Sequence, residues 1–213
     1  MNLIILGAPG SGKGTQAEML SKKLGLFYLQ TGDLAREWAR EDSRIKEIID
    51  SGKLIPEVEM TDYVMKYLEK KVPEGKNILF EGFPRFISQY EKYEEWLNSK
   101  GQKIDKVISL DIDEEIAIQR LSSRRLCEKC KKVYNLITNP PAENGMCECG
   151  GNLIQRKDDM HESVKVRFEY YRDNTKKLID HLNDKGKLLH INADRPINII
   201  FNDILKNLEV NNA

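Results

Sequence analysis

Gly7-Ala8-Pro9-Gly10-Ser11-Gly12-Lys13-Gly14-Thr15 is the stretch that decides the fold of this 213-residue chain. Residues 3–6 before it form a short, β-branched apolar run typical of a buried strand, and residues 16–24 after it have a helical pattern. A strand, a glycine-rich loop, a lysine and a helix in this order predict a phosphate-binding loop. Its backbone N–H groups would surround a polyphosphate, aided by the helix dipole and by Lys13.

The position of the hydroxyl residue narrows the class of phosphate-binding loop. The general pattern places Ser or Thr directly after the lysine. Here Gly14 follows Lys13, and the hydroxyl comes one residue later at Thr15. This arrangement is not typical of GTPases or of helicase-type ATPases, and an ordinary glycine turn would not explain the strand, the lysine and the helix together.

Composition limits the partners of the chain. There are 34 basic and 34 acidic residues, so the formal net charge is zero and no general attraction to nucleic acid or membranes is expected. No apolar run approaches the roughly 20 residues that span a bilayer, and the start of the chain resembles a strand rather than a secretory leader. We therefore expect a cytoplasmic protein without a membrane partner.

Apolar strand patterns alternate with amphipathic helix patterns along the chain. Strands are predicted at 2–7, 26–29, 77–81, 106–111 and 187–191. Helices are predicted at 13–24, 34–50, 57–71, 88–99, 114–125, 161–185 and 196–208. The alternation predicts an α/β fold, a P-loop three-layer sandwich with a five-stranded parallel sheet. Residues 31–55 and 126–159 interrupt the alternation and are predicted to be insertions at the rim of the site.

Two further clusters follow predicted strands, where ligands of parallel sheets bind. Thr31-Gly32-Asp33 is followed by Arg36, and Glu81-Gly82-Phe83-Pro84-Arg85 is followed by Gln89. Arg85 could neutralise a phosphate, Gly82 could let the backbone approach a base, and Gln89 could bond to the base edge. Each cluster alone could also be a turn with a solvated arginine, but together beside the loop they favour a second phosphate site.

The phosphate loop and the two clusters that follow the predicted strands resemble the motifs of adenylate kinase. The similarity continues through Arg120, Arg124-Arg125, the four cysteines, residues 156–159 and Arg167, and it covers nearly the whole chain in order. It implies reversible, Mg²⁺-dependent transfer of the terminal phosphoryl group of ATP to AMP, giving two ADP. It also implies a core domain (1–29, 56–122 and 160–213), a helical AMP-binding insertion (30–55) and a small zinc-ribbon-like lid over ATP (123–159).

The resemblance assigns roles to individual positions. The implied catalytic residues are Lys13, Arg85, Arg124, Arg156 and Arg167. The implied ATP-binding residues are Gly10, Ser11, Gly12, Lys13, Gly14, Thr15, Arg120, Arg124, Val133, Tyr134, Ala193 and Arg195. The implied AMP-binding residues are Thr31, Arg36, Lys53, Leu54, Ile55, Gly82, Phe83, Pro84, Arg85, Gln89, Arg156 and Arg167, with Lys53, Leu54 and Ile55 acting through their backbones. Arg120 and Arg124, four residues apart, are expected on one face of one helix.

Acidic residues have a supporting part in the implied mechanism. An AMP phosphate is already an anionic nucleophile, so arginines rather than a general base are expected to carry catalysis. Asp33, Asp158 and Asp159 are expected to pair with arginines. Thr15 and Glu81 are candidate outer-shell partners of Mg²⁺, although the family usually has Asp at position 81. Ala193 stands where the family usually has Gly. Asp111 and Asp113 could imitate a metal-binding acid, but we expect them to be structural.

The four cysteines, Cys127, Cys130, Cys147 and Cys149, predict a metal site. Two close pairs separated by a hairpin-sized gap resemble a structural zinc ribbon, and all-protein ligation leaves no open position. The second pair is C-x-C, one residue shorter than the usual C-x2-C or C-x2-D. Cys149 is expected to be the fourth ligand, with Gly150-Gly151 adjusting the turn. The alternative is four loose thiols in a mobile lid.

Two other functions fit parts of the sequence. A related kinase acting on UMP or CMP would carry the same arginines, although Thr31 and Gln89 favour adenine. A zinc-ribbon nucleic-acid-binding protein with a nucleotide switch would also contain a phosphate loop and cysteines, but the zero net charge disfavours it. The expected partners are ATP, AMP and ADP, without nucleic acid, and a self-contained site suggests a monomer.

Overall fold

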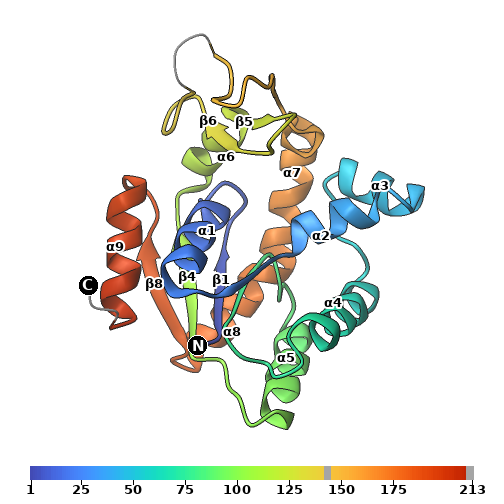
Figure 1. Cartoon of the computed structure of the whole chain (residues 1–213), viewed down its shortest axis with the longest axis vertical. Helices are drawn as coiled ribbons and strands as arrows, with labels where there is room; N and C mark the ends of the chain where they lie inside the picture. The colour runs from blue at the N-terminus through green and yellow to red at the C-terminus, as the bar shows by residue number, and fades with distance from the viewer. Residues whose placement is uncertain (142–144, 210–213) are drawn as a thin grey trace.

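A five-stranded parallel sheet forms the centre of the computed structural model, which describes residues 1–141 and 145–209 (Figure 1). Residues 142–144 of the expected lid and 210–213 of the expected core lie outside the described residues. The strands are β1 (Leu3–Gly7), β2 (Phe27–Gln30), β3 (Ile78–Glu81), β4 (Lys106–Asp111) and β8 (Leu188–Asn192), in the order β2-β3-β1-β4-β8. The predicted parallel sheet is confirmed.

Helices cover both faces of this sheet. Ile4 and Leu6 point to the face covered by α4 (Glu57–Lys71), α5 (Ile87–Ser99) and α8 (Lys176–Asp184). Leu3 and Ile5 point to the opposite face, covered by α1 (Lys13–Leu24) and α9 (Ile197–Asn207). Because both faces are buried, the strands are continuous apolar runs rather than alternating ones. The three-layer sandwich is therefore as predicted.

The strand register brings the candidate binding segments to one edge of the sheet. In the parallel pairs, Gln30 lies opposite Glu81, Gly7 opposite Leu110 and Asp111 opposite Asn192. All five strands consequently end near the same level, and the loops that follow them meet there. The phosphate loop begins at this edge, and so do the segments that start with Thr31 and Gly82.

Residues 31–50 form two helices, α2 (Thr31–Trp38) and α3 (Ser43–Asp50), at one side of the sheet (Figure 1). The prediction of one helix over 34–50 is wrong. The side chain of Asp42 accepts hydrogen bonds from the backbone N–H groups of Arg44 (2.9 Å) and Ile45 (3.2 Å). This cap starts a new helix after a turn at residues 39–42.

The predicted helix over 114–125 is also wrong at its end. Helix α6 (Glu114–Ser122) stops at Ser122, and β5 (Arg124–Cys127) begins two residues later. Strand β5 pairs with β6 (Val133–Asn135) and β7 (Leu153–Ile154) in a small antiparallel sheet, which lies at the top of Figure 1. Arg120 and Arg124 therefore lie in different elements and do not share a helix face.

The long helix predicted over 161–185 is a continuous helical path with a π-helical turn inside it. Helix α7 (His161–Tyr170) passes through the turn η2 (Tyr171–Thr175) into α8, and the 3-10 turn η1 (Lys157–Asp159) precedes α7. Among residues 1–141 and 145–209, no helix combines the length and the apolar character needed to cross a bilayer.

Candidate active site

The phosphate loop is held tightly between β1 and α6. Gly12 caps the start of α1 in a left-handed conformation. Gly10 has a φ of +85°, and a Cβ added there would lie only 2.3 Å from the carbonyl oxygen of Ala117 on α6. Only glycine satisfies both the conformation and the close approach. The loop is thus shaped before any ligand binds.

Lys13 lies folded over this loop. Its Nζ donates hydrogen bonds to the carbonyl oxygens of Gly7 (2.9 Å) and Ala8 (2.7 Å). Burial lowers the pKa of Lys13 to about 7; Glu81 opposes this shift, whereas the positive charges of Arg85, Arg167 and Arg124 add to it. An ammonium that is both desolvated and repelled by neighbouring cations is poised to bind an anion.

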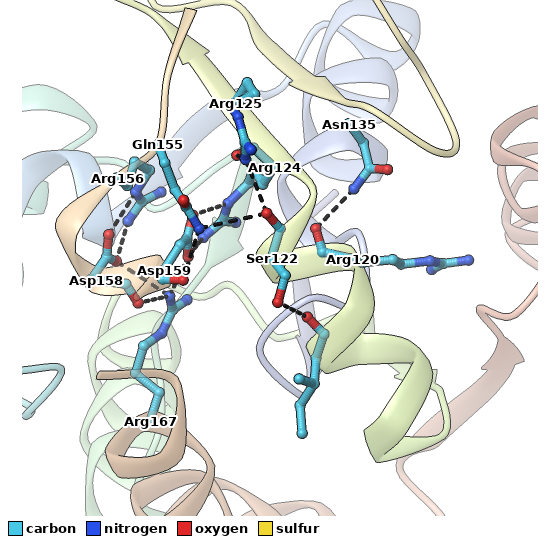
Figure 2. Close-up of polar contacts among 11 residues, drawn as sticks. Arg120, Ser122, Arg124, Arg125, Asn135, Gln155, Arg156, Asp158, Asp159 and Arg167 are labelled. Atoms are coloured by element: carbon cyan, nitrogen blue, oxygen red, sulfur yellow. Dashed lines mark hydrogen bonds and ion pairs between the residues drawn. The ribbon is translucent and has the colours of Figure 1, made fainter. Parts of the chain in front are cut away.

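Three arginines gather around two carboxylates at the base of the small sheet (Figure 2). The side chain of Asp159 is fully buried and accepts hydrogen bonds from Arg124 Nε (2.7 Å) and Arg167 Nη1 (2.8 Å). Arg156 Nε donates to Asp158 Oδ1 at 2.8 Å. The expected pairing of Asp158 and Asp159 with arginines is confirmed.

The charged side chains of this cluster shift one another's pKa values. Burial raises the pKa of Asp158, but Arg156 and Arg167 outweigh it, so the net pKa is about 2. Burial and the neighbouring Arg124 lower the pKa of Arg167 to about 10. Burial acts against the charge of Arg156, yet Asp158 more than compensates and raises its pKa. Three guanidinium groups against two carboxylates leave an excess of positive charge.

Arg120 belongs to a different part of the site. Its Nη1 donates to the carbonyl oxygen of Ala193 at 2.9 Å, and its side chain points away from the Asp159 group (Figure 2). The structure thus brings together two positions, 73 residues apart, that were both expected to bind ATP. Arg195 instead faces α9, with Nη1 2.7 Å from Asp203 Oδ2.

Ala193 fits its loop without strain. The described non-glycine residues with positive φ are Asn77, Lys131 and Glu209, so Ala193 does not need the glycine that is usual there. It is fully buried, and its N–H donates to the carbonyl oxygen of Asp111 at 2.8 Å.

The second arginine site surrounds the end of β3. Arg85 Nε donates to the carbonyl oxygen of Gly82 at 2.8 Å, and Arg85 N donates to Gln89 Oε1 at 2.8 Å. Burial lowers the pKa of Arg85, Glu81 opposes this shift and Arg36 adds to it, so a second cation lies within electrostatic reach. Arg36 pairs with Asp33, as expected. Thr31 Oγ1 donates to the carbonyl oxygen of Glu81 at 3.2 Å.

Several expected nucleotide-binding residues have side chains that lie in the protein interior. Phe83 is buried and packs on Phe80, with ring centroids 5.2 Å apart. Ile55 is buried with Ala35 and Ile45. Tyr134 is 3% exposed and faces the cysteines. These three residues would have to contact a nucleotide through their backbones. The neighbouring expected residues differ in exposure. Pro84 is buried and Leu54 is partly buried, whereas Lys53 and Val133 are exposed, Val133 by 47%.

The four cysteines form one compact cluster in the small sheet. Their Sγ atoms all lie within 4.8 Å of one another, with Cys127–Cys149 at 3.5 Å and Cys130–Cys147 at 3.4 Å. Sulfur atoms bound to tetrahedral Zn²⁺ through bonds of about 2.3 Å are about 3.8 Å apart. A Cβ added at Gly151 would lie 2.6 Å from Cys127 Sγ, so glycine is needed beside the cluster. The arrangement is compatible with one tetrahedral metal ion, and Cys149 takes part despite the shortened spacing.

Sequence reasoning missed Tyr28 and Gln30 on β2. A Cβ added at Gly14 would lie 3.6 Å from Gln30 Nε2 and 3.8 Å from the Tyr28 hydroxyl, so both reach the phosphate loop. The buried Tyr28 hydroxyl has no hydrogen-bond partner among the described residues. The alternation of side chains along a strand could have revealed these two residues, because it places both on the face of the sheet that α1 covers.

Asp111 and Asp113 are structural, as expected. Asp113 caps α6 by accepting from the N–H of Glu115 at 2.8 Å. Asp111 lies at the end of β4, where it accepts from Ser109 Oγ at 2.6 Å and is 2.8 Å from His190 Nδ1. Both carboxylates are thus engaged within the scaffold.

Comparison with known proteins agrees with this geometry. A family model described as adenylate kinase matches residues 5–187. A protein named adenylate kinase from Caldicellulosiruptor bescii is 40% identical over 99% of this chain and 100% of its own length. Proteins of the same name from Bacillus licheniformis (39%, covering 96% of each chain) and Archaeoglobus fulgidus (39%, covering 98% of each chain) are similarly close. The chain belongs to the adenylate kinase family, an enzyme family of nucleoside monophosphate kinases.

Proposed function

We propose that this protein transfers the terminal phosphoryl group of MgATP reversibly to AMP, giving two ADP. The observation that carries the proposal is the convergence of positive charge on Lys13. Arg85, Arg124 and Arg167 come from three other segments, and all three act electrostatically on the lysine of the phosphate loop. A site with an excess of positive charge suits two polyanions whose phosphates meet.

The two nucleotides would bind from opposite sides of this charge. We assign ATP to the backbone of Gly10, Ser11, Gly12, Gly14 and Thr15 and to Lys13, with its adenine near Arg120, Ala193, Arg195 and the Val133–Asn135 strand. We assign AMP to Thr31, Arg36, the backbone of residues 53–55, the Gly82–Arg85 loop and Gln89. Gln89 Oε1 accepts from Arg85 N, and Gln89 Nε2 donates to the carbonyl oxygen of Glu57 at 3.4 Å, so one N–H of the amide is left for a base edge.

The chemistry needs positioning more than covalent help. An oxygen of the AMP phosphate attacks the γ-phosphorus in line, the bond from that phosphorus to the bridging β-γ oxygen breaks, and ADP leaves. Arg124, Arg156 and Arg167 would stabilise the charge on the transferring group, with Arg85 holding the acceptor phosphate. Asp158 and Asp159 would keep these arginines oriented before the nucleotides arrive.

Two segments would move during turnover. The lid is proposed to span 123–159 and the AMP-binding insertion 30–55, with residues 1–29, 56–122 and 160–213 as the core. Closing the lid would exclude water, which otherwise competes as phosphoryl acceptor. The separate antiparallel sheet β5–β7 and the buried cluster of Ala35, Ile45 and Ile55 within 30–55 support these limits.

Two metals are proposed. Thr15 and Glu81 would hold Mg²⁺ through water, and the ion would neutralise negative charge on the phosphates of ATP. Zn²⁺ would be held by Cys127, Cys130, Cys147 and Cys149, and it would be structural because four protein ligands complete its coordination. We also propose a cytoplasmic monomer, because one chain supplies all the residues assigned to the site. The balanced charge supports the absence of nucleic acid among its partners.

A coupled assay of ADP formation tests the function. ATP is offered with AMP, UMP, CMP or GMP in turn, and AMP should give the highest kcat/KM. Arg85→Ala should lower kcat/KM with AMP on the order of 10³-fold. Arg172→Ala is the matched control, because Arg172 is half exposed and pairs with Glu114 outside the site. A higher kcat/KM with UMP or CMP would reject the AMP assignment, and salt-dependent binding of random RNA without turnover would favour the nucleic-acid alternative.

A further inference from the structure

We propose that Tyr134 is a positioning residue of the metal site, whose phenol donates a hydrogen bond to the metal-bound thiolate of Cys147. The inference rests on the proposed metal site and goes beyond its four ligands. It also gives the Tyr134 side chain a different task from the nucleotide contact expected for this position.

The contact lies inside the lid rather than on its surface. The Tyr134 hydroxyl is 3.3 Å from Cys147 Sγ, and the two residues are 3% and 4% exposed. Cys147 Sγ is in turn 3.4 Å from Cys130 Sγ and 3.5 Å from Cys149 Sγ. The phenol therefore approaches the cluster at one sulfur, from strand β6 and not from either cysteine turn.

The direction of the hydrogen bond follows from the chemistry of a metal-bound sulfur. A thiolate has no proton to give, so the hydroxyl must be the donor. The backbone N–H of Glu148 points to the same hydroxyl oxygen at 3.5 Å, which occupies its acceptor side and leaves its proton for sulfur. A donor held in this way partly neutralises the thiolate and orients it toward the metal.

The tyrosine ring is held in place from its outer side. Lys132 Nζ lies 5.3 Å from the ring centroid and pairs with Glu148 Oε2 at 2.7 Å. This ion pair lies over the ring, so the charge of Lys132 also acts on the phenol. The exposed Lys131, whose Nζ donates to the carbonyl oxygen of Glu128 at 2.7 Å, is therefore the matched control position for Tyr134.

The short second cysteine pair explains why a donor from another strand matters. In the first pair, the N–H of Cys130 donates to Cys127 Sγ at 3.4 Å. Cys147 and Cys149 are separated by one residue instead of two, so their turn offers one backbone amide fewer between the ligands. The phenol from β6 adds a donor to this pair from outside the turn.

The test compares full-length wild type with Tyr134→Phe, each loaded with Zn²⁺ or with Co²⁺ as a spectroscopic substitute. Loss of the donor should move the sulfur-to-Co²⁺ charge-transfer band to lower energy, because the thiolate electrons become less stabilised. Zn²⁺ transfer to a chromophoric chelator should become faster and apparent affinity weaker, on the order of 10-fold or more. Lys131→Gln should leave the band and the transfer rate unchanged.

The outcomes separate this inference from the metal site itself. If wild type binds no Zn²⁺ or Co²⁺, the proposed metal site fails and this inference fails with it. If wild type binds one ion with a four-thiolate spectrum and Tyr134→Phe gives the same band and rate, only this inference is overturned. If Tyr134→Phe does not keep its lid folded, 3-fluorotyrosine at position 134 replaces it; this stronger donor should move the band to higher energy, and an unmoved band would overturn the inference.

Discussion

Asp159 lies where two arginines from different elements meet. Arg124 comes from the start of β5 and Arg167 from α7, and both donate to one buried carboxylate. Without that carboxylate, two guanidinium groups, on side chains only 21% and 20% exposed, would remain close together with less compensation. The acid therefore has two effects: it stabilises the fold, and it holds the arginines where the transferring phosphoryl group is proposed to lie.

Asp159→Asn should be strongly destabilising for this reason. Removing one partner of a buried ion pair typically costs about 3–5 kcal/mol, because the remaining charge is left uncompensated. Urea unfolding of the ligand-free protein measures the change. Asp62→Asn is the control: Asp62 is half exposed and pairs with Lys92 at 3.0 Å, so a loss of about 0.5 kcal/mol or less is expected. Equal losses in the two variants would contradict a special role for Asp159.

Lys13 predicts a pH dependence of nucleotide binding. Its pKa is about 7 in the ligand-free protein, so it is about half protonated at pH 7 and mostly neutral at pH 8 to 9. Bound polyphosphate favours the protonated form and raises the pKa. MgATP binding should therefore take up protons above pH 7, and its affinity should fall as pH rises from 7 to 9.

Calorimetry in two buffers with different ionisation enthalpies measures this proton uptake. Lys13→Arg is the control, because an arginine in this place is charged in both the free and the bound state over this pH range. Wild type at pH 8 should take up more protons than the variant. The same uptake in both proteins would show that another group is responsible.

At the scale of elements, local signals predicted most of the fold. Helices α1 and α4 begin and end where their amphipathic patterns do, and β4 has the predicted limits. The end of α6 could not be predicted in this way. Residues 124–127 contain two arginines and a leucine, which favour helix locally, but pairing with β6 and β7 holds them as a strand. The break between α2 and α3 carried a readable signal, the capping Asp42, inside an otherwise helical pattern.

Because the phosphate loop contacts α6, one methyl group added at Gly10 should lower the stability of the protein steeply. Gly10→Ala combines a φ of +85° with a Cβ that would lie 2.3 Å from the Ala117 carbonyl oxygen, so the loop or α6 must move. Gly25→Ala is the matched control, because Gly25 has a φ of +64° with nothing within 4 Å of an added Cβ. The control should lose about 1–2 kcal/mol from backbone strain alone.

Gly10→Ala should lose more stability than this control, and it should also bind MgATP more weakly. Urea unfolding and equilibrium binding measure the two effects separately. A Gly10→Ala protein that matches Gly25→Ala in stability and wild type in MgATP affinity would show that the loop adapts without cost.

At the scale of the whole molecule, topology explains why the site could be predicted in outline. The carboxyl ends of parallel strands meet at one edge, so motifs after β1, β2 and β3 had to come together. The direction in which individual side chains of these segments point could not be predicted from topology. Phe83 and Tyr134 lie in expected binding segments, but their rings face the core and the cysteines because packing across distant segments decides their direction.

The proposed lid and core should respond differently to removal of the proposed zinc ion. Among the described residues, one cluster on the sheet contains sixteen buried members and another thirteen, whereas the lid cluster has only Cys127, Tyr134 and Cys147. A unit with so small an apolar core needs another source of stability, and metal binding can supply it. Stripping the metal with a strong chelator should therefore remove hydrogen-exchange protection from β5, β6 and β7 while β1 and β4 keep theirs. Cys147→Ser should reproduce this pattern without chelator, and loss of protection in β1 and β4 at the same metal occupancy would show instead that lid and core unfold as one unit.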